Sequence, residues 1–157
     1  DDAIEKLIRK YYPVIFKYCS YHAPDRQNAE DLTQETFERF FGSLPRYQHR
    51  DKTVNYLYVI ARNLCRDAHA RKREILLEEL PETGENPLKE IEEKLEIERA
   101  LKKLPEETRE VIILYYFQNL KLKEISKILQ IGLPLVKYRI SKAKKFMRTY
   151  LGEEDEV

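Results

Sequence analysis

The sequence contains few residues that break helices or cross-link chains: 4 of its 157 residues are glycine, 7 are proline and 2 are cysteine. Barrels and sandwiches need many turns, so scarce glycine together with 36% charged residues favours a helix-rich protein. Two thiols, Cys19 and Cys65, cannot make a structural zinc site by themselves, and we interpret them as reduced core residues. Because 42% apolar residues can build real cores, we expect an all-α fold.

Other features are missing altogether. No apolar run approaches the roughly 18 residues that a membrane span needs, and the first residues lack the basic and apolar segments of a signal peptide. We therefore expect a cytoplasmic protein. The sequence also lacks a glycine loop for phosphates, a nucleophile elbow and a paired cysteine and histidine. These absences favour a protein that is not an enzyme and that uses no cofactor and no metal.

Charge is distributed unevenly along the chain, although the net charge is only +1. Residues 1–73 hold 14 basic and 10 acidic side chains, residues 74–100 hold 3 and 10, and residues 101–157 hold 12 and 8. Two basic blocks therefore flank an acidic middle. This pattern indicates two surfaces that meet a polyanion, separated by a segment that avoids one.

Apolar residues at three- and four-residue steps predict three helices in the first block. The first begins near Ile4, and we expect Pro13 to kink or split it. Asn28 can cap the second, which ends at Gly42 and Pro45. Its apolar side is Leu32, Thr36, Phe37, Phe40 and Phe41, and its other side is Glu30, Asp31, Gln34, Glu35 and Glu38. The third helix has the core residues Val54, Leu57, Ile60, Ala61, Leu64, Cys65 and Ala68.

An acidic stretch with two prolines and a glycine, residues 78–87, has little to bury and predicts a linker. We therefore predict two small helical domains, residues 1–74 and 91–157, joined by a flexible acidic linker over residues 75–90. Beyond the acidic stretch, Leu88, Ile91, Leu95, Leu101 and Leu104 predict an amphipathic helix, and Pro105 suits the first turn of the next one.

The last two predicted helices, about Leu122–Leu129 and Pro134–Leu151, have the helix-turn-helix pattern. The residues expected to face inward are Leu122, Ile125, Ile128, Leu129, Val136, Ile140, Ala143 and Met147. From Lys121 to Arg148 there are nine basic residues and one acid, Glu124. Acids usually intersperse a merely solvated lysine face, so this excess of cations predicts contacts with phosphates.

The end of the third helix carries a second basic cluster, from Arg62 to Arg73. The same helix contains Tyr56, Tyr58, Asn63 and His69. Aromatic rings stack on unpaired bases, arginines follow a phosphate backbone, and asparagine can hydrogen-bond a base edge. This mixture favours single-stranded or melted DNA, although cations also favour a helix C-terminus through its dipole.

Four segments, in order, resemble the extracytoplasmic-function (ECF) sigma factors of the sigma-70 family over nearly the whole chain. Residues 29–37 (AEDLTQETF) resemble the hallmark helix of region two, and residues 56–67 (YLYVIARNLCRD) resemble the promoter-reading helix that follows it. Residues 104–111 (LPEETREV) resemble the start of region four. Residues 124–129 (EISKIL) and 136–144 (VKYRISKAK) resemble its helix-turn-helix.

The resemblance implies a sigma factor that binds core RNA polymerase and directs transcription initiation at promoters. It implies that region two docks on the clamp of the β′ subunit through Asp31, Gln34, Glu35 and Phe37. The −10 element would be read by Tyr56, Arg62, Asn63 and Arg66. Region four would contact the β flap and read the −35 element, with candidate residues Lys137, Tyr138, Arg139, Ser141, Lys142 and Lys144. An anti-sigma factor is an expected further partner.

The sequence departs from the family pattern in region four. The usual turn glycine after Leu129 is replaced by Gln130, with Gly132 two positions later. The recognition helix begins with Leu133-Pro134-Leu135 instead of small polar residues, and Tyr56 stands where tryptophan is common. Since helix-turn-helix proteins read bases mainly from that N-terminal end, −35 specificity is the part that the resemblance defines least.

Three alternatives remain open from the sequence. One is a dimeric regulator with a C-terminal helix-turn-helix that needs no polymerase for specific binding. Another is an adaptor or RNA-binding protein without promoter activity. The third is a helical metal-dependent hydrolase that uses Asp31 and Glu35, although His22, His49 and His69 are scattered.

Overall fold

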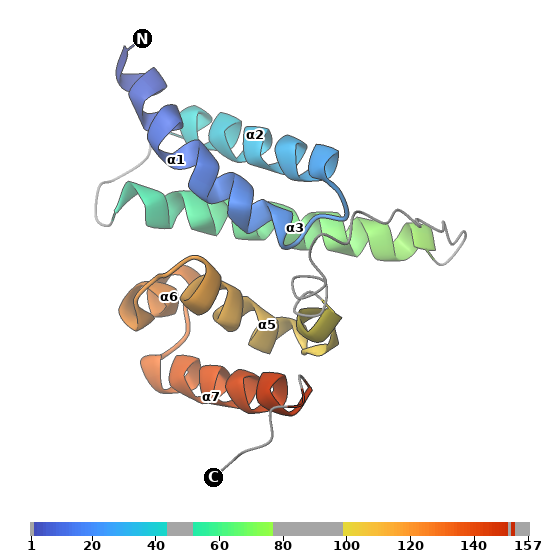
Figure 1. The fold of residues 1–157 in the computed structure, drawn as a ribbon. Coiled ribbons are helices and arrows are strands. Elements are labelled where there is room, and N and C mark those ends of the chain that lie inside the picture. The colour runs from blue at the N-terminus through green and yellow to red at the C-terminus, as the bar shows by residue number, and fades with distance from the viewer. Residues whose placement is uncertain (1, 44–51, 77–98, 151, 153–157) are drawn as a thin grey trace. The chain divides into compact units, whose positions relative to one another are not determined.

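The computed structural model describes residues 2–43, 52–76, 99–150 and 152, and every regular element within these segments is helical (Figure 1). The helices belong to two compact units. The first contains α1, α2 and α3, and the second contains α5, α7 and most of α6. The predicted all-α fold is therefore confirmed. In the described segments, no helix has an apolar stretch long enough to span a lipid bilayer.

The first helix, α1 (Asp2–Ser20), passes through Pro13 without interruption, so Pro13 does not split this segment. A proline inside a helix removes one backbone donor and leaves the carbonyl four residues earlier, here that of Arg9, without its helical partner. Pro13 is exposed, which lets water replace the missing donor. The helix is also retained because Ile15, Tyr18 and Cys19 are buried beyond the proline.

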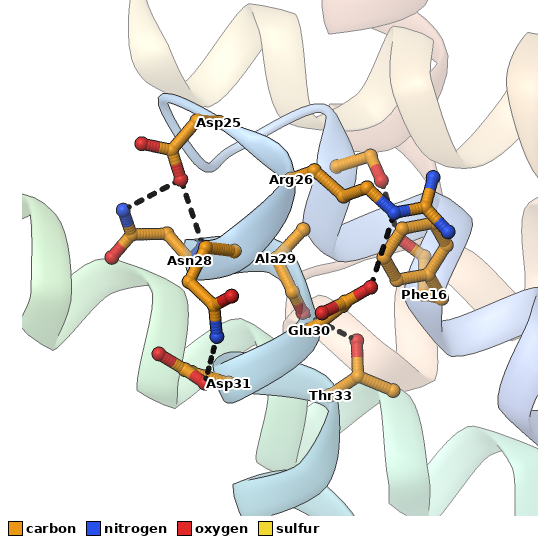
Figure 2. Close-up of polar contacts among 10 residues, drawn as sticks. Phe16, Asp25, Arg26, Asn28, Ala29, Glu30, Asp31 and Thr33 are labelled. Carbon is orange, nitrogen blue, oxygen red and sulfur yellow. Dashed lines mark hydrogen bonds and ion pairs between the residues drawn. The ribbon is translucent and has the colours of Figure 1, made fainter.

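The second helix, α2 (Arg26–Gly42), is capped by Asp25 and not by Asn28 as the sequence predicted. Asp25 has extended backbone, and its Oδ1 accepts hydrogen bonds from the backbone N of Asn28 at 2.9 Å and from its Nδ2 at 2.8 Å (Figure 2). A capping oxygen satisfies backbone donors that have no partner inside the helix. Asn28 is thus the third helical residue, and its side chain supports the cap.

The packing side of α2 buries Ala29, Thr33, Thr36, Phe37 and Phe40. Both threonines are completely buried, and each hydroxyl donates to a backbone carbonyl of the preceding turn, Thr33 to Ala29 and Thr36 to Leu32, at 2.7 Å. Buried hydroxyls without partners would be costly, so these bonds let threonine serve as a core residue.

The third helix, α3 (Thr53–Leu76), completes the core of the first unit. Tyr58 meets Tyr18 of α1 edge to face, with ring centroids 5.5 Å apart. Cys19 and Cys65 are both buried thiols that form no disulfide, as predicted. A side-chain hydrogen bond with Cys65 lowers the pKa of Cys19, while burial acts in the opposite direction. The two thiols therefore join α1 to α3 inside the core.

In the second unit, residues 99–103 are helical and precede α5 (Glu106–Ile112). Pro105 is the residue before the first helical one, so it lies one position earlier than the predicted first turn. The chain then continues as a π-helical turn, η3 (Ile113–Phe117), in which the backbone N of Gln118 donates to the carbonyl of Ile113 at 2.9 Å.

Helix α6 (Leu122–Leu129) has the predicted bounds, and α7 (Leu133–Tyr150) begins one residue earlier than predicted. The predicted inward residues are buried, except that Leu122 and Met147 are half-buried. Gln130 ends α6 in the left-handed conformation, with φ 56° and ψ 47°. Two hydrogen bonds close the turn. The backbone N of Ile131 donates to the carbonyl of Ser126 at 3.2 Å, and the hydroxyl of Ser126 donates to the carbonyl of Ile131 at 2.6 Å.

Some predicted features lie outside the described residues. They are most of the predicted linker, the helix expected around Leu88–Leu95, the polar stretch between α2 and α3, and Leu151 at the end of α7. Helix α3 itself extends to Leu76, two residues beyond the end predicted for the first domain.

Candidate functional site

An acidic and polar stripe covers the side of α2 that is opposite to its packing side. Gln34, Glu35 and Glu38 lie three, four and seven residues after Asp31, a spacing that places all four on one helix face. Asp31, Gln34 and Glu38 are exposed, and Glu35 is half-buried. The structure therefore brings together Asp31, Gln34 and Glu35, three of the four residues predicted to dock on polymerase.

Each carboxylate of this region has a neighbour one turn away. Oδ1 of Asp31 accepts from Gln27 Nε2 at 3.1 Å, and Oε2 of Glu35 accepts from Arg39 Nη2 at 3.0 Å. Figure 2 shows the preceding pair, in which Nε of Arg26 lies 3.1 Å from Oε2 of Glu30. Such exposed pairs contribute well under about 1 kcal/mol each, so the carboxylates can exchange these partners for those of another molecule.

Phe37, the fourth predicted docking residue, does not lie on this surface. It is 5% exposed, and its ring stacks on Tyr12 of α1 with centroids 5.9 Å apart. Burial raises the pKa of Tyr12, and the negative charge of Glu30 raises it further. The prediction of a direct contact through Phe37 therefore needs correction: this side chain belongs to the core that supports α2.

A second surface lies along α3. Tyr56, Asn63 and Arg66 are spaced by seven and three residues and therefore share one side of the helix. Asn63 and Arg66 are exposed, whereas Tyr56 and Arg62 are half-buried. The Tyr56 hydroxyl donates to Ser43 Oγ at 3.0 Å, and its ring packs 5.7 Å from that of Phe40. The four predicted −10 residues thus lie within one stretch of α3.

Two aromatic residues of the same helix have other roles. Tyr58 is buried against Tyr18, so its ring is not available for stacking on a base. Nε2 of His69 lies 2.6 Å from the carbonyl of His22, in the turn that follows α1. These contacts make both residues part of the packing between α1 and α3.

Helix α7 carries the third surface. Its 18 residues include six cations and no acid. The predicted contacts Lys137, Tyr138, Ser141, Lys142 and Lys144 are all exposed, while Val136, Ile140 and Ala143 are buried on the opposite side. The ammonium of Lys142 lies 5.5 Å from the ring centroid of Tyr138, one turn away. This face can offer ammonium groups to phosphates together with an aromatic hydroxyl and a serine hydroxyl.

Two cations of α7 contact other elements of the same unit. Nη2 of Arg139 lies 3.5 Å from Oε1 of Glu107 on α5, and the Arg139 side chain is 21% exposed. Nζ of Lys144 lies 5.9 Å from the ring centroid of Tyr116 in η3. Arg139 therefore differs from the other predicted −35 residues, because its guanidinium already has a carboxylate partner inside the protein.

In the parts of the chain that the structure describes, no three His, Cys, Asp or Glu side chains gather where they could hold a metal ion. Asp31 and Glu35, the pair considered for a metal-dependent hydrolase, instead contact Gln27 and Arg39.

Comparison with protein families gives two matches, and each accounts for one unit. Residues 7–75 match the model of Sigma-70 region 2, and residues 94–147 match the model of Sigma-70, region 4. The first match contains the acidic stripe of α2 and the surface of α3, and the second contains the helix-turn-helix of α6 and α7.

Curated relatives agree with this result. The chain is 31% identical over 159 residues to the ECF RNA polymerase sigma factor SigE of Mycolicibacterium smegmatis, an alignment that covers 95% of this chain and 62% of SigE. It is 28% identical over 136 residues to the ECF RNA polymerase sigma factor SigM of Bacillus subtilis, with 82% of this chain and 83% of SigM covered. The chain thus spans less than two thirds of SigE and most of SigM.

Solved structures share the fold. The sigma factor RpoE of Bartonella quintana, in complex with the anti-sigma factor NepR, matches with a TM-score of 0.81, 19% identity and coverage of 99% of this chain and 100% of that one. CnrH, in complex with the cytosolic domain of CnrY, matches with a TM-score of 0.78, 19% identity and coverage of 98% and 90%. Two helical units that carry regions 2 and 4 in this order define a sigma-type protein. The chain belongs to the ECF group of the sigma-70 family.

Reasoning from sequence missed Leu135 as a residue of the exposed face of α7, and it missed the pairing of Arg139 with Glu107. Helical spacing gives a signal for the first, because Leu135, Tyr138 and Lys142 form a stripe off the buried side. Glu107 is 32 positions before Arg139, and no local pattern joins such distant residues.

Proposed function

We propose that this chain acts as a sigma factor, a non-catalytic subunit that binds core RNA polymerase and directs it to promoters by recognising −10 and −35 elements. The observation that carries the proposal is the division of charge between surfaces within one sigma-family chain. The exposed stripe of α2 is acidic and polar, whereas α7 carries six cations and no acid. Such surfaces suit a basic protein partner and DNA respectively. We expect this work to take place in the cytoplasm.

Asp31, Gln34 and Glu35 are the proposed contacts with the β′ clamp, and Glu38 extends their stripe. Phe37 contributes through the core that holds α2 in place. Region 4 is proposed to contact the β flap as well as DNA.

Tyr56, Arg62, Asn63 and Arg66 are the proposed −10 residues. Asn63 is the best candidate for a base contact, because an exposed asparagine can hydrogen-bond a base edge. In region 4, Lys137, Lys142 and Lys144 are proposed to contact phosphates, and Tyr138 and Ser141 the base edges. Arg139 is proposed to position α7 through Glu107.

An anti-sigma factor is a further proposed partner. RpoE of Bartonella quintana was solved in complex with the anti-sigma factor NepR, and it shares this fold over 99% of the chain. The acidic stripe of α2 and the cations of α7 are the surfaces that such an inhibitor would need to cover.

The test is in vitro transcription with the host's core polymerase and a library of promoter sequences. Glu35→Lys should weaken binding to core polymerase with an altered salt dependence. The matched control is Glu5→Lys, the same charge reversal at an exposed position of α1, which should bind normally. Asn63→Ala should reduce open-complex formation while core binding stays intact. Normal core binding by Glu35→Lys would reject the docking surface, and no transcription by the unmodified chain would reject the function.

A further inference from the structure

The N-terminal end of α7 exposes apolar side chains. Leu135 is 38% exposed and Tyr138 is 58% exposed, which places both among the exposed large hydrophobic residues of the described chain. Leu135, Tyr138 and Lys142 are spaced by three and four residues and form one stripe. Pro134 is exposed next to them. Exposed apolar side chains that lie together often mark a surface that binds a partner, so we expect a partner that fits this cluster.

This end of α7 is held in a defined position. The backbone N atoms of Leu135 and Val136 both donate to the carbonyl of Gly132 at 3.1 Å, which fixes the first turn of the helix. Val136 is completely buried on the opposite side. Leu135 is thus presented outward by an anchored turn.

The surroundings of the apolar cluster favour DNA as its partner. Cations occupy the same helix without any compensating acid, and the Lys142 ammonium lies 5.5 Å from the centroid of the Tyr138 ring. An apolar protein groove would have to supply several carboxylates to match these cations. Duplex DNA supplies phosphates along both edges of the groove in which a recognition helix lies.

Helix-turn-helix proteins read bases mainly with the first residues of the second helix. In this chain those residues are Leu133, Pro134 and Leu135, whose side chains can neither donate nor accept a hydrogen bond. The apolar group that base pairs present in the major groove is the 5-methyl of thymine.

We infer that Leu135, assisted by the ring of Tyr138, contacts thymine methyl groups in the −35 element and thereby selects A·T pairs at one or two positions. The inference rests on the proposed function, since it requires that α7 lies on the −35 element. It assigns specificity to apolar contact where the family pattern would place small polar residues. The lysines around Leu135 would then contribute to the affinity for DNA without determining which sequence is preferred.

The experiment removes the methyl group and leaves the base pair intact. A preferred −35 sequence is first selected from a random library with the unmodified holoenzyme, and each thymine in it is then replaced by uracil. Removing one methyl from an apolar contact should weaken binding roughly fourfold. Leu135→Ala should bind the thymine duplex more weakly and should lose the discrimination between thymine and uracil at its position.

Two variants serve as matched controls. Ile4→Ala truncates another exposed apolar side chain, on α1, and should retain full discrimination. Lys145→Ala removes an exposed cation of α7 and should weaken binding to the thymine and uracil duplexes equally.

The outcomes separate this inference from the proposed function. Specific −35 binding without any loss on uracil substitution, or a selected element without preferred A·T pairs, overturns the inference and leaves the function standing. If Leu135→Ala still discriminates between thymine and uracil, the role of Leu135 is overturned. The same holds if this variant keeps that discrimination but loses binding to polymerase or to an inhibitor. Holoenzyme that prefers no −35 sequence overturns both.

Discussion

Arg139 and Glu107 form an ion pair that joins α7 to α5: Nη2 of the guanidinium lies 3.5 Å from Oε1 of the carboxylate. The Arg139 side chain is 21% exposed, and that of Glu107 is 75% exposed. In the same helix, the Lys144 ammonium lies 5.9 Å from the ring centroid of Tyr116. Arg139, which its sequence alone would assign to DNA, therefore joins α7 to α5 within the protein.

We predict different effects for two cations of α7. Lys142→Gln should lower the slope of log affinity against log salt by about one unit, because a lost phosphate contact releases about one counterion fewer. Arg139→Gln should change the slope much less, since its charge is already compensated by Glu107. The measurement is binding of holoenzyme to a fixed promoter at several salt concentrations. Equal changes in slope would show that Arg139 leaves Glu107 to contact a phosphate.

Phe37 gives a prediction about stability. Because its ring is buried against Tyr12, Phe37→Ala should lower the free energy of unfolding of the first unit by about 3–5 kcal/mol. Phe37→Leu conserves most of the volume and should cost less than about 1.5 kcal/mol. Urea denaturation followed by helical circular dichroism measures both. If Phe37 were instead a surface contact, Phe37→Leu would weaken polymerase binding without changing the urea midpoint.

The cap of α2 can be tested separately. Asp25→Ala removes the oxygen that accepts from the backbone and side chain of Asn28, and it should cost about 1 kcal/mol of stability. Asn28→Ala keeps the bond from its own backbone N to Asp25 and loses only the side-chain bond, so it should cost less. A larger loss in Asn28→Ala than in Asp25→Ala would contradict this assignment of the cap.

The sequence predicted the helices where one face is apolar over several turns, as in α6, whose bounds were correct. Prediction was weaker where two local signals compete. Asp25 and Asn28 both favour a cap, and the choice depends on the turn after α1. It is also difficult to predict whether an aromatic residue beside a polar stripe is buried. Helical spacing alone does not decide whether Phe37 faces Tyr12 or the polymerase.

Local clusters of cations predicted the surfaces of α3 and α7, whereas the docking surface of α2 was implied by the resemblance to ECF sigma factors. The charge pattern did not predict which residues of these surfaces pair with other helices of the protein. The pairing of Arg139 with Glu107 and the edge-to-face contact of Tyr58 with Tyr18 depend on packing between helices that are distant in sequence. Leu135 was seen as a departure from the family pattern, and its exposure became evident only with the position of α7.

Gln130 gives the last prediction, because it takes the place of a turn glycine. Its φ of 56° lies in the left-handed region, which costs a side-chain-bearing residue about 1 kcal/mol relative to glycine. Gln130→Gly should therefore stabilise the second unit and slow amide exchange in α6 and α7 roughly fivefold.

Two matched variants make the test specific for this turn. Asn119 has a similar φ of 55°, but asparagine tolerates this conformation, so Asn119→Gly should stabilise less. Lys123→Gly, at an exposed position in the first turn of α6, should destabilise, because glycine is a poorer helix former than lysine. If Gln130→Gly destabilises as Lys123→Gly does, the Gln130 side chain contributes a contact that outweighs the strain. Since the turn sets the direction of α7, promoter preference should be compared in the same variants. We expect it to be unchanged, because Gly132 and the bonds between Ser126 and Ile131 remain in place.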